Sequence, residues 1–112
     1  MKRILTQKLE TVKKMTTKYL AKLTEVCKSC SPETVKVYFR NTKRLYKLTN
    51  EGDDIPVNSK WLKNEKLVKK YKSQPLKIRR HLSVAAVKFF QAVKEEPGNW
   101  YKYMVDDNKS YQ

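Results

Sequence analysis

Basic and apolar side chains alternate along residues 35–47 with the spacing of an α-helix. Four cations follow one another at intervals of 4, 3 and 4 residues: Lys36, Arg40, Lys43 and Lys47. A mostly apolar set repeats these intervals one position earlier: Val35, Tyr38, Thr42 and Leu45. Because an α-helix has about 3.6 residues per turn, each set forms one stripe, and the two stripes lie roughly 150° apart. The segment therefore predicts a helix with one buried face and one face directed at negative charge.

Apolar residues recur at helical spacing along most of the chain, and residues that interrupt helices are few. The sequence has 2 Gly and 4 Pro among 112 residues and no strand-like alternation of useful length, which favours long helices. We predict an all-α fold, a single domain built as a compact orthogonal bundle of four to five helices. Trp61 and Leu62 are expected to anchor the loop before the third helix. The expected helices span residues 4–28, 32–49, 64–72, 75–95 and 99–105.

Capping and stopping residues mark most of these boundaries. Ser, Asn and Gln side chains are available to accept hydrogen bonds from the first turns of the helices. The expected caps are Ser31, Asn64, Ser73 or Gln74, and Asn99. Pro32 and Pro75 are expected in the first turn of their helices, where a missing N–H does no harm. Pro97 and Gly98 are expected to end the helix before them.

The chain is strongly basic, and its charge is unevenly distributed. It has 26 Lys and Arg against 11 Asp and Glu, a formal net charge of +15. Residues 55–94 hold eleven cations and one acid, Glu65. Such a balance favours a polyanionic partner, with a basic surface that merely keeps the protein in solution as the alternative.

A second basic cluster lies at the start of the expected helix 75–95. Helix N-termini and the side chains of Lys and Arg both suit phosphate groups. With the stripe on residues 36–47, this cluster predicts double-stranded DNA as the partner. The predicted DNA-binding residues are Lys36, Arg40, Lys43, Arg44, Lys47, Lys77, Arg79, Arg80, His81 and Lys88.

The residue pattern contains no catalytic constellation. Cys27 and Cys30 form a CxxC pair, but a structural zinc site needs four ligands and the single His is distant. Two reduced thiols at a helix junction are therefore expected, with a metal shared across a dimer as the alternative. His81 has no nucleophile or orienting carboxylate nearby in sequence, and Tyr111 is expected to be a frayed tail residue. No metal, cofactor or small-molecule substrate is predicted.

The sequence also bears on the location of the protein. No apolar run approaches the length of a membrane span, and the apolar stretch after Met1 is too short for a cleavable signal. We predict no membrane partner and an intracellular location with DNA.

Three segments share the pattern of a known DNA-binding module. Residues 31–45 carry Ser31, Thr34 and Tyr38 in an S-x-x-T-x-x-x-Y helix. Residues 76–90 (LKIRRHLSVAAVKFF) and residues 61–68 (WLKNEKLV) provide a long and a short helical motif. Residues 31–45 resemble the second helix of the core-binding domain of tyrosine recombinases. Residues 61–68 resemble its short third helix, and residues 76–90 resemble its last long helix. That domain is the SAM-like module on the amino-terminal side of phage-integrase-type enzymes.

The resemblance implies a four-helix or five-helix bundle of SAM-like topology that clamps one side of duplex DNA. Its second and fourth helices would lie against the DNA. Carried onto this sequence, it implies contacts from Lys36, Arg40, Lys43, Arg44 and Lys47 on one helix, and from Lys77, Arg79, Arg80 and His81 on the other. The family's catalytic domain, with its Arg, Lys, His and Tyr constellation, has no counterpart, so DNA binding without strand cleavage is expected. A large DNA virus is one source that the Lys-rich and Asn-rich composition would suit.

Two other functions remain open from the sequence. The first is a helical interaction or scaffold module that forms a homo-oligomer through the helix at residues 4–28. A stable oligomer indifferent to DNA would favour it. The second is the DNA-binding fragment of a longer recombinase, which the full reading frame would decide.

Overall fold

The structure is a computed structural model that describes residues 18–52 and 55–111. Residues 18–26 are helical, and the predicted portion of this helix at residues 4–17 lies outside the described residues. The further elements are α2 (Pro32–Tyr46), the 3-10 helix η1 (Lys60–Lys63), α3 (Glu65–Lys72), α4 (Leu76–Ala92) and α5 (Asn99–Tyr111). No strand occurs in these two ranges, so the prediction of an all-α bundle is confirmed.

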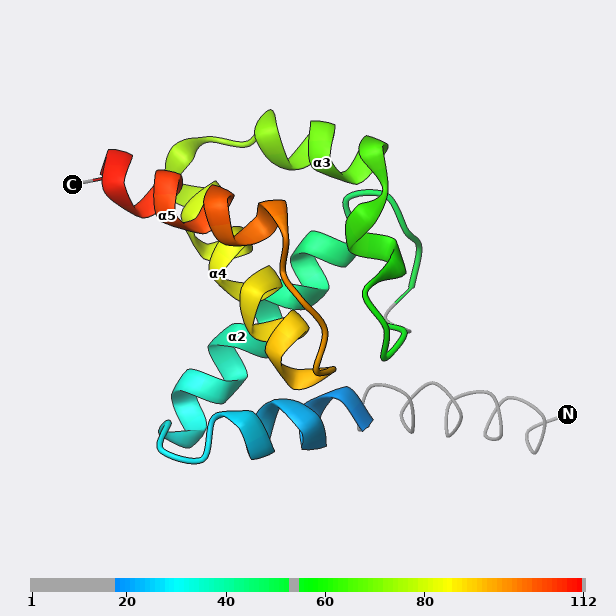
Figure 1. Cartoon of the computed structure of the whole chain (residues 1–112), viewed down its shortest axis with the longest axis vertical. Coiled ribbons are helices and arrows are strands. Elements are labelled where there is room, and N and C mark those ends of the chain that lie inside the picture. The colour runs from blue at the N-terminus through cyan, green and yellow to red at the C-terminus, as the bar shows by residue number, and fades with distance from the viewer. Residues whose placement is uncertain (1–17, 53–54, 112) are drawn as a thin grey trace, which may run out of the picture.

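Helix α4 is the central element of the bundle. It packs against α2 on one side and against α5 on the other, and Figure 1 shows it crossing α2. Helix α3 lies across the end of the bundle, in contact with η1, α2 and α4. The helix at residues 18–26 lies below, beside the start of α2 and the end of α4 (Figure 1). Because α4 has neighbours on both sides, its side chains have less freedom to face solvent than those of α2.

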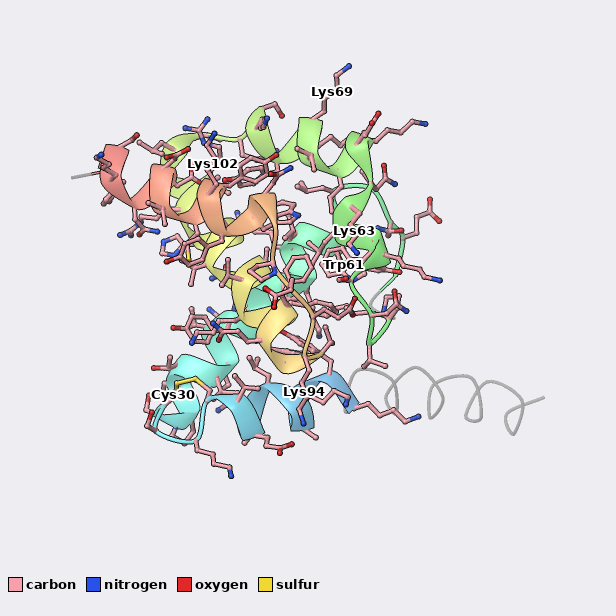
Figure 2. The ribbon with its side chains drawn as sticks, in the orientation of Figure 1. Cys30, Trp61, Lys63, Lys69, Lys94 and Lys102 are labelled. Carbon is pink, nitrogen blue, oxygen red and sulfur yellow. A yellow bond between two sulfur atoms is a disulfide. The ribbon has the colours of Figure 1, made fainter. Side chains whose placement is uncertain are left out.

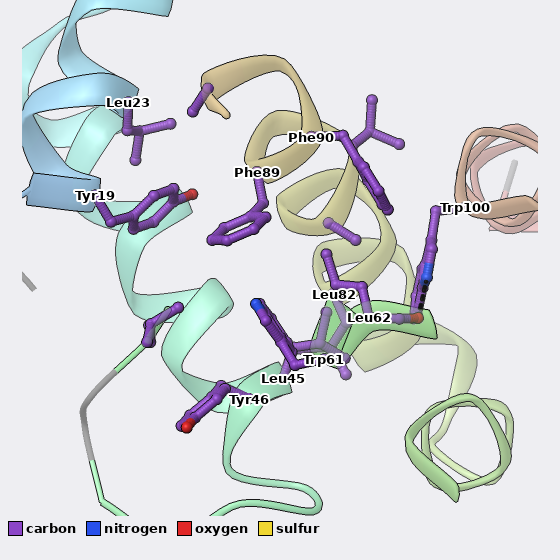
Figure 3. Close-up of a cluster of buried hydrophobic side chains, with 14 of the residues drawn as sticks. Tyr19, Leu23, Leu45, Tyr46, Trp61, Leu62, Leu82, Phe89, Phe90 and Trp100 are labelled. Atoms are coloured by element: carbon purple, nitrogen blue, oxygen red, sulfur yellow. Dashed lines mark hydrogen bonds between the residues drawn. The ribbon is translucent and has the colours of Figure 1, made fainter. Parts of the chain in front are cut away.

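Aromatic side chains from several helices meet in the hydrophobic core (Figure 3). Phe89 of α4 is fully buried, and its ring centroid lies 4.8 Å from Tyr19 and 5.2 Å from Trp61. Trp61 in turn meets Tyr46 of α2 edge to face at 5.2 Å. Trp61 and Leu62 are both buried, which confirms their predicted role as anchors. Such aromatic pairs add roughly 0.5–1.5 kcal/mol each beyond the area that they bury.

Helix α2 begins as the sequence predicts. The Ser31 hydroxyl accepts a hydrogen bond from the Thr34 backbone N–H at 3.2 Å, and Pro32 occupies the first turn. On its buried side, the Tyr19 hydroxyl lies 3.2 Å from the Thr42 hydroxyl, which itself donates to the Tyr38 carbonyl. This contact fixes the first helix against α2. The helix ends at Tyr46, three residues before the predicted limit at Thr49, because residues 47–49 form a turn.

Two predicted boundaries of α4 are wrong. The N-cap is Pro75, and neither Ser73 nor Gln74 caps the helix, because both side chains bond to the Lys70 carbonyl. The helix ends at Ala92, ahead of Pro97 and Gly98.

The stop after Ala92 comes from the backbone at Lys94. Lys94 has a left-handed φ of 59°, and the Glu95 N–H reaches back to the Phe90 carbonyl at 2.9 Å. This is the hydrogen bond of a Schellman motif. It directs the Glu95 carboxylate to Ser59, whose hydroxyl and backbone N–H donate to it at 2.7 and 3.1 Å.

Helix α5 continues to Tyr111, well past the predicted end at residue 105. Asp107 is 7 % exposed and lies in the interface with α3 and α4. Tyr111 is therefore part of the last turn of a helix, and the Arg80 guanidinium lies 3.9 Å above its ring. The prediction of a frayed tail residue at Tyr111 is wrong, because these contacts reach back across more than twenty residues and are invisible in local sequence.

The two cysteines are joined. Cys27 and Cys30 form a disulfide at the turn between the first helix and α2, and Figure 2 shows the bond beside Cys30. The Cys30 N–H donates to the Cys27 carbonyl at 3.0 Å, so the turn brings the two Cα atoms to 5.2 Å. That separation is within the range that a disulfide spans. The prediction of two reduced thiols is therefore wrong for this structure.

Candidate nucleic-acid interface

The two stripes predicted for α2 are present in the structure. Val35, Thr42 and Leu45 are buried, and Tyr38 is half-buried beside them. The opposite side of the helix is exposed at Lys36, Arg40, Arg44 and Lys47, while Lys43 is half-buried. The spacing therefore predicted correctly which side of α2 meets solvent.

Lys36, Lys43, Arg40 and Arg44 have few interactions with described residues that would compete with an external anion. Lys36 pairs with Glu33 at 3.7 Å, with both side chains largely exposed, and such surface pairs contribute little. The Lys43 ammonium lies 4.7 Å from the centre of the Phe39 ring. Arg40 and Arg44 form no ion pair with any acid in the described ranges. Their guanidinium groups are thus available to an external anion.

The amino-terminal half of α4 meets this side of α2. Arg80 and His81 line a shallow hollow of about 140 Å³ together with Val37 and Asn41 of α2. On a helix, Arg40 and Arg44 lie next to Val37 and Asn41, on the side away from the core. The two predicted basic segments therefore come together along one edge of the bundle.

Arg80 is held in place by aromatic stacking. Its guanidinium lies 3.9 Å from the ring centre of Tyr111, and its Nε is buried without a hydrogen-bond partner among the described residues. Further along α4, the Lys88 ammonium lies 5.6 Å from the ring of Tyr38. Lys77 and His81 are exposed. Stacking on a ring leaves the edge of a guanidinium free to bind an anion.

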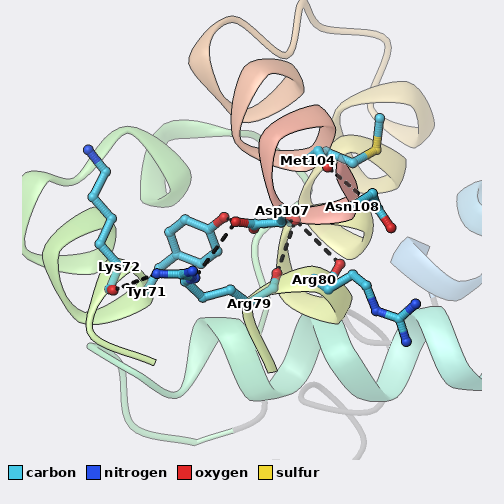
Figure 4. Close-up of polar contacts among 8 residues, drawn as sticks. Tyr71, Lys72, Arg79, Arg80, Met104, Asp107 and Asn108 are labelled. Carbon is cyan, nitrogen blue, oxygen red and sulfur yellow. Dashed lines mark hydrogen bonds and ion pairs between the residues drawn. The ribbon is translucent and has the colours of Figure 1, made fainter. Parts of the chain in front are cut away.

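Arg79 points in a different direction from its neighbour. Figure 4 shows its guanidinium directed at Asp107 of α5 and at the end of α3. The Arg79 Nε lies 3.7 Å from Asp107 Oδ1, and one terminal nitrogen donates to the Lys72 carbonyl at 3.3 Å. Arg79 was predicted to contact DNA, but in the structure its charge is already paired inside the protein.

Asp107 is the centre of a buried polar network. The Tyr71 hydroxyl and the Ser83 hydroxyl both donate to its Oδ2, the second at 3.0 Å. Burial and the neighbouring Asp107 carboxylate both raise the pKa of Tyr71, so this hydroxyl stays protonated. The hydrogen bonds from Tyr71 of α3 and Ser83 of α4 to Asp107 of α5 join the three helices. This network therefore has a structural role.

Helix α3 carries exposed cations that the sequence reasoning did not assign to the site. Lys63 precedes the helix, and Lys66, Lys69, Lys70 and Lys72 follow on its outer side, all exposed. The count of eleven cations against one acid over residues 55–94 was the available signal. These lysines were not assigned to the site because the resemblance implies DNA contacts from the second and fourth helices and none from the short third helix.

Other kinds of site find no support in the described ranges. No group of three His, Cys, Asp or Glu side chains there is placed to hold a metal ion. None of the helices in that part of the chain is long and apolar enough to cross a membrane. No family model, curated protein or solved structure gives a significant match to this sequence.

Proposed function

We propose that this protein binds double-stranded DNA, without catalysis, through the joint surface of α2 and the start of α4. The α2–α4 surface consists of Lys36, Arg40, Lys43, Arg44, Lys47, Lys77, Arg80 and His81. The observation that carries the proposal is the exposed pair Arg40 and Arg44, which form no ion pair with a described acid. Arg80 and His81 lie nearby, across a shallow hollow that they line with Val37 and Asn41 of the same helix as the pair. Concentrated cations of this kind are what a phosphate backbone requires.

Geometry favours a helical polyanion over a small anion. The cations of α2 extend from Lys36 to Lys47, and eleven residues of helix span about 16 Å. The hollow beside them is too small and open to enclose a metabolite. A duplex carries a phosphate charge for roughly every 1.7 Å of its axis, so it can pair with cations along the whole length of the stripe.

Arginine at the centre of the surface suits this function. Its planar group binds phosphate oxygens through two parallel hydrogen bonds, and it also recognises guanine in the major groove. A relationship to the core-binding domain of tyrosine recombinases remains part of the proposal. It rests on the motifs in residues 31–45, 61–68 and 76–90 and on the all-helical architecture.

Fluorescence anisotropy with a short labelled duplex over a series of salt concentrations tests the proposal. If about six phosphates are neutralised, the logarithm of the binding constant should fall against the logarithm of salt with a slope near −5. A protein that binds no duplex even at low salt would falsify the proposal. Light scattering on the same sample tests the alternative of a scaffold oligomer, which predicts assembly that DNA does not change.

A paired substitution tests the assignment of the surface. The double change Arg40→Ala and Arg44→Ala should weaken duplex binding by about thirtyfold and reduce the salt slope by about 2. The double change Lys18→Ala and Lys22→Ala is the matched control, because it removes the same charge from exposed positions on another helix. Equal losses in both variants would show that net charge alone is responsible.

A further inference from the structure

The lysines of α3, together with Lys63 at the end of η1, form a second strongly basic surface. We define the α3 lysine surface as Lys63, Lys66, Lys69, Lys70 and Lys72, all of which are exposed. Glu65 is the one acid in this segment. The buried side of α3 is occupied by Leu67 and Tyr71, and the four lysines of this helix are exposed to solvent.

Most of these lysines have no partner within the protein. The Lys70 ammonium donates to the Leu48 carbonyl at 3.0 Å, and the Lys72 ammonium lies 5.0 Å from the Tyr103 ring centre. The ammonium groups of Lys63, Lys66 and Lys69 form no hydrogen bond or ion pair among the residues that the structure describes. Like charges placed this closely repel one another, and an external polyanion relieves that repulsion.

The α3 lysine surface faces a different direction from the α2–α4 surface. Helix α3 runs across the carboxyl-terminal end of α2 (Figure 1), where Lys70 contacts Leu48. Its other flank rests on α5, since the Tyr71 ring lies 4.8 Å from Trp100. Figure 2 shows Lys69 directed away from the body of the bundle. Lys69 therefore faces outward beyond the end of α2, whereas Arg40 and Arg44 lie on the exposed side of α2 itself.

Because α3 runs across the end of α2, a duplex that lies along α2 would have to turn at that end to follow the lysines along α3. DNA has a persistence length of about 150 base pairs, and bending a site of 20–30 base pairs by 40–90° costs roughly 1–6 kcal/mol. A second duplex segment reaches the α3 lysine surface without that cost. Lysine ammonium groups act as point charges that do not select a geometry, so this surface suits any phosphate backbone.

We propose that the α3 lysine surface binds a second duplex, so that one protein molecule bridges two DNA segments. The inference rests on the proposed function, because the α2–α4 surface must hold the first segment. The arginine-containing surface holds one segment in a defined orientation, while the lysine surface captures another through charge alone. Bridging of this kind brings distant stretches of DNA together.

A bead-capture experiment tests bridging with the full chain. A biotinylated duplex is immobilised on streptavidin beads, and a fluorescent duplex of the same sequence is added with the protein. Wild-type protein should retain the fluorescent duplex. The triple change Lys63→Gln, Lys66→Gln and Lys69→Gln should lower that retention by at least about tenfold, while affinity for a single duplex stays within about threefold. The matched control is the triple change Lys18→Gln, Lys22→Gln and Lys28→Gln, which should retain the fluorescent duplex.

Three outcomes would overturn the inference. Wild-type protein that binds one duplex but retains no second duplex would exclude bridging. An α3 triple variant that bridges normally would place the second contact elsewhere, for example in a protein dimer. A variant that loses bridging and single-duplex affinity in the same proportion would mean that α3 extends one footprint. Failure of the proposed function is distinct, because wild-type protein would then show no single-duplex binding at all.

Discussion

The described part of the chain holds two pairs of arginines that differ in their exposure to solvent and in their partners. Arg40 and Arg44 of α2 are exposed and form no ion pair with a described acid. Arg79 and Arg80 of α4 are half-buried, one paired with Asp107 and the other stacked on Tyr111. The difference follows from position, because α2 has an open outer side whereas α4 lies between α2 and α5.

The comparison shows that the local density of cations does not reveal what each cation does. A charge that is removed from water needs a partner, because an unpaired buried charge is costly. Arg79 has such a partner in Asp107 from a helix more than twenty residues away. Arg40 remains in water and needs none, so it stays free to bind an anion.

The change Asp107→Ala should lower the unfolding free energy more than any other substitution in the two arginine regions. It leaves Arg79 without its acid and removes the acceptor of the Tyr71 and Ser83 hydroxyls. Loss of a buried ion pair and its hydrogen bonds costs about 3 kcal/mol of unfolding free energy, with allowance for the partial exposure of Arg79. Urea denaturation followed by circular dichroism measures the change.

The neighbouring acid supplies the control for that experiment. Asp106 is exposed on the same helix, so Asp106→Ala should change the unfolding free energy by no more than about 0.5 kcal/mol. If both changes have equal effects, the Asp107 network is not what holds α5 against α3 and α4. The folded fraction of Asp107→Ala should still bind DNA through α2.

Substitutions in the two arginine pairs should have opposite effects on DNA binding and on stability. Arg40→Ala with Arg44→Ala should cost about 2 kcal/mol of DNA-binding free energy and almost no stability. Arg79→Ala should do the opposite, lowering the unfolding free energy by about 1–2 kcal/mol while DNA affinity changes less than threefold. Anisotropy titrations and urea denaturation on the same preparations give both numbers. An Arg79→Ala variant that is stable but binds weakly would return Arg79 to the interface.

Sequence reasoning predicted the elements of this fold better than their tertiary partners. The helical spacing gave the buried and exposed sides of α2, and Ser31 and Asn64 cap helices as expected. Those features depend on residues within one or two turns of each other. The length of α5 and the pairing of Arg79 depend on Asp107, which in sequence is simply one acid of an acidic segment. Only the packing of three helices brings it against Tyr71, Ser83 and Arg79.

Alkaline pH should weaken the packing of Tyr19, the buried residue that joins the first helix to α2. Burial raises the pKa of Tyr19 to about 12, although its hydrogen bond with Thr42 lowers it. Tyrosine in the unfolded chain titrates near 10, so the unfolded state releases this proton first. The contribution of Tyr19 is therefore complete below about pH 10. Between about pH 10 and pH 12 it is lost at roughly 1.4 kcal/mol per pH unit.

The change Tyr19→Phe isolates this effect from the titration of other groups. It removes the ionisable hydroxyl and keeps the ring that packs on Phe89, at a cost of about 1 kcal/mol at neutral pH. Above about pH 10 its unfolding free energy should fall less steeply than that of wild type. Parallel pH profiles of the two proteins would show that the Tyr19 hydroxyl contributes nothing to alkaline sensitivity.

Lys94 differs from both arginine pairs, because its effect on stability comes from its backbone conformation. Its left-handed φ of 59° closes the Schellman motif at the end of α4, and glycine adopts that conformation without the strain of a side chain. Lys94→Gly should therefore raise the unfolding free energy by about 1 kcal/mol. Lys94→Ala removes the same charge but keeps a Cβ, so it should bring no such gain.

Because Lys94 lies at the opposite end of α4 from Arg80, neither change should weaken duplex binding beyond about twofold. Equal stabilisation by both substitutions would assign the gain to relief of charge repulsion, and the strained backbone at Lys94 would then carry no measurable cost.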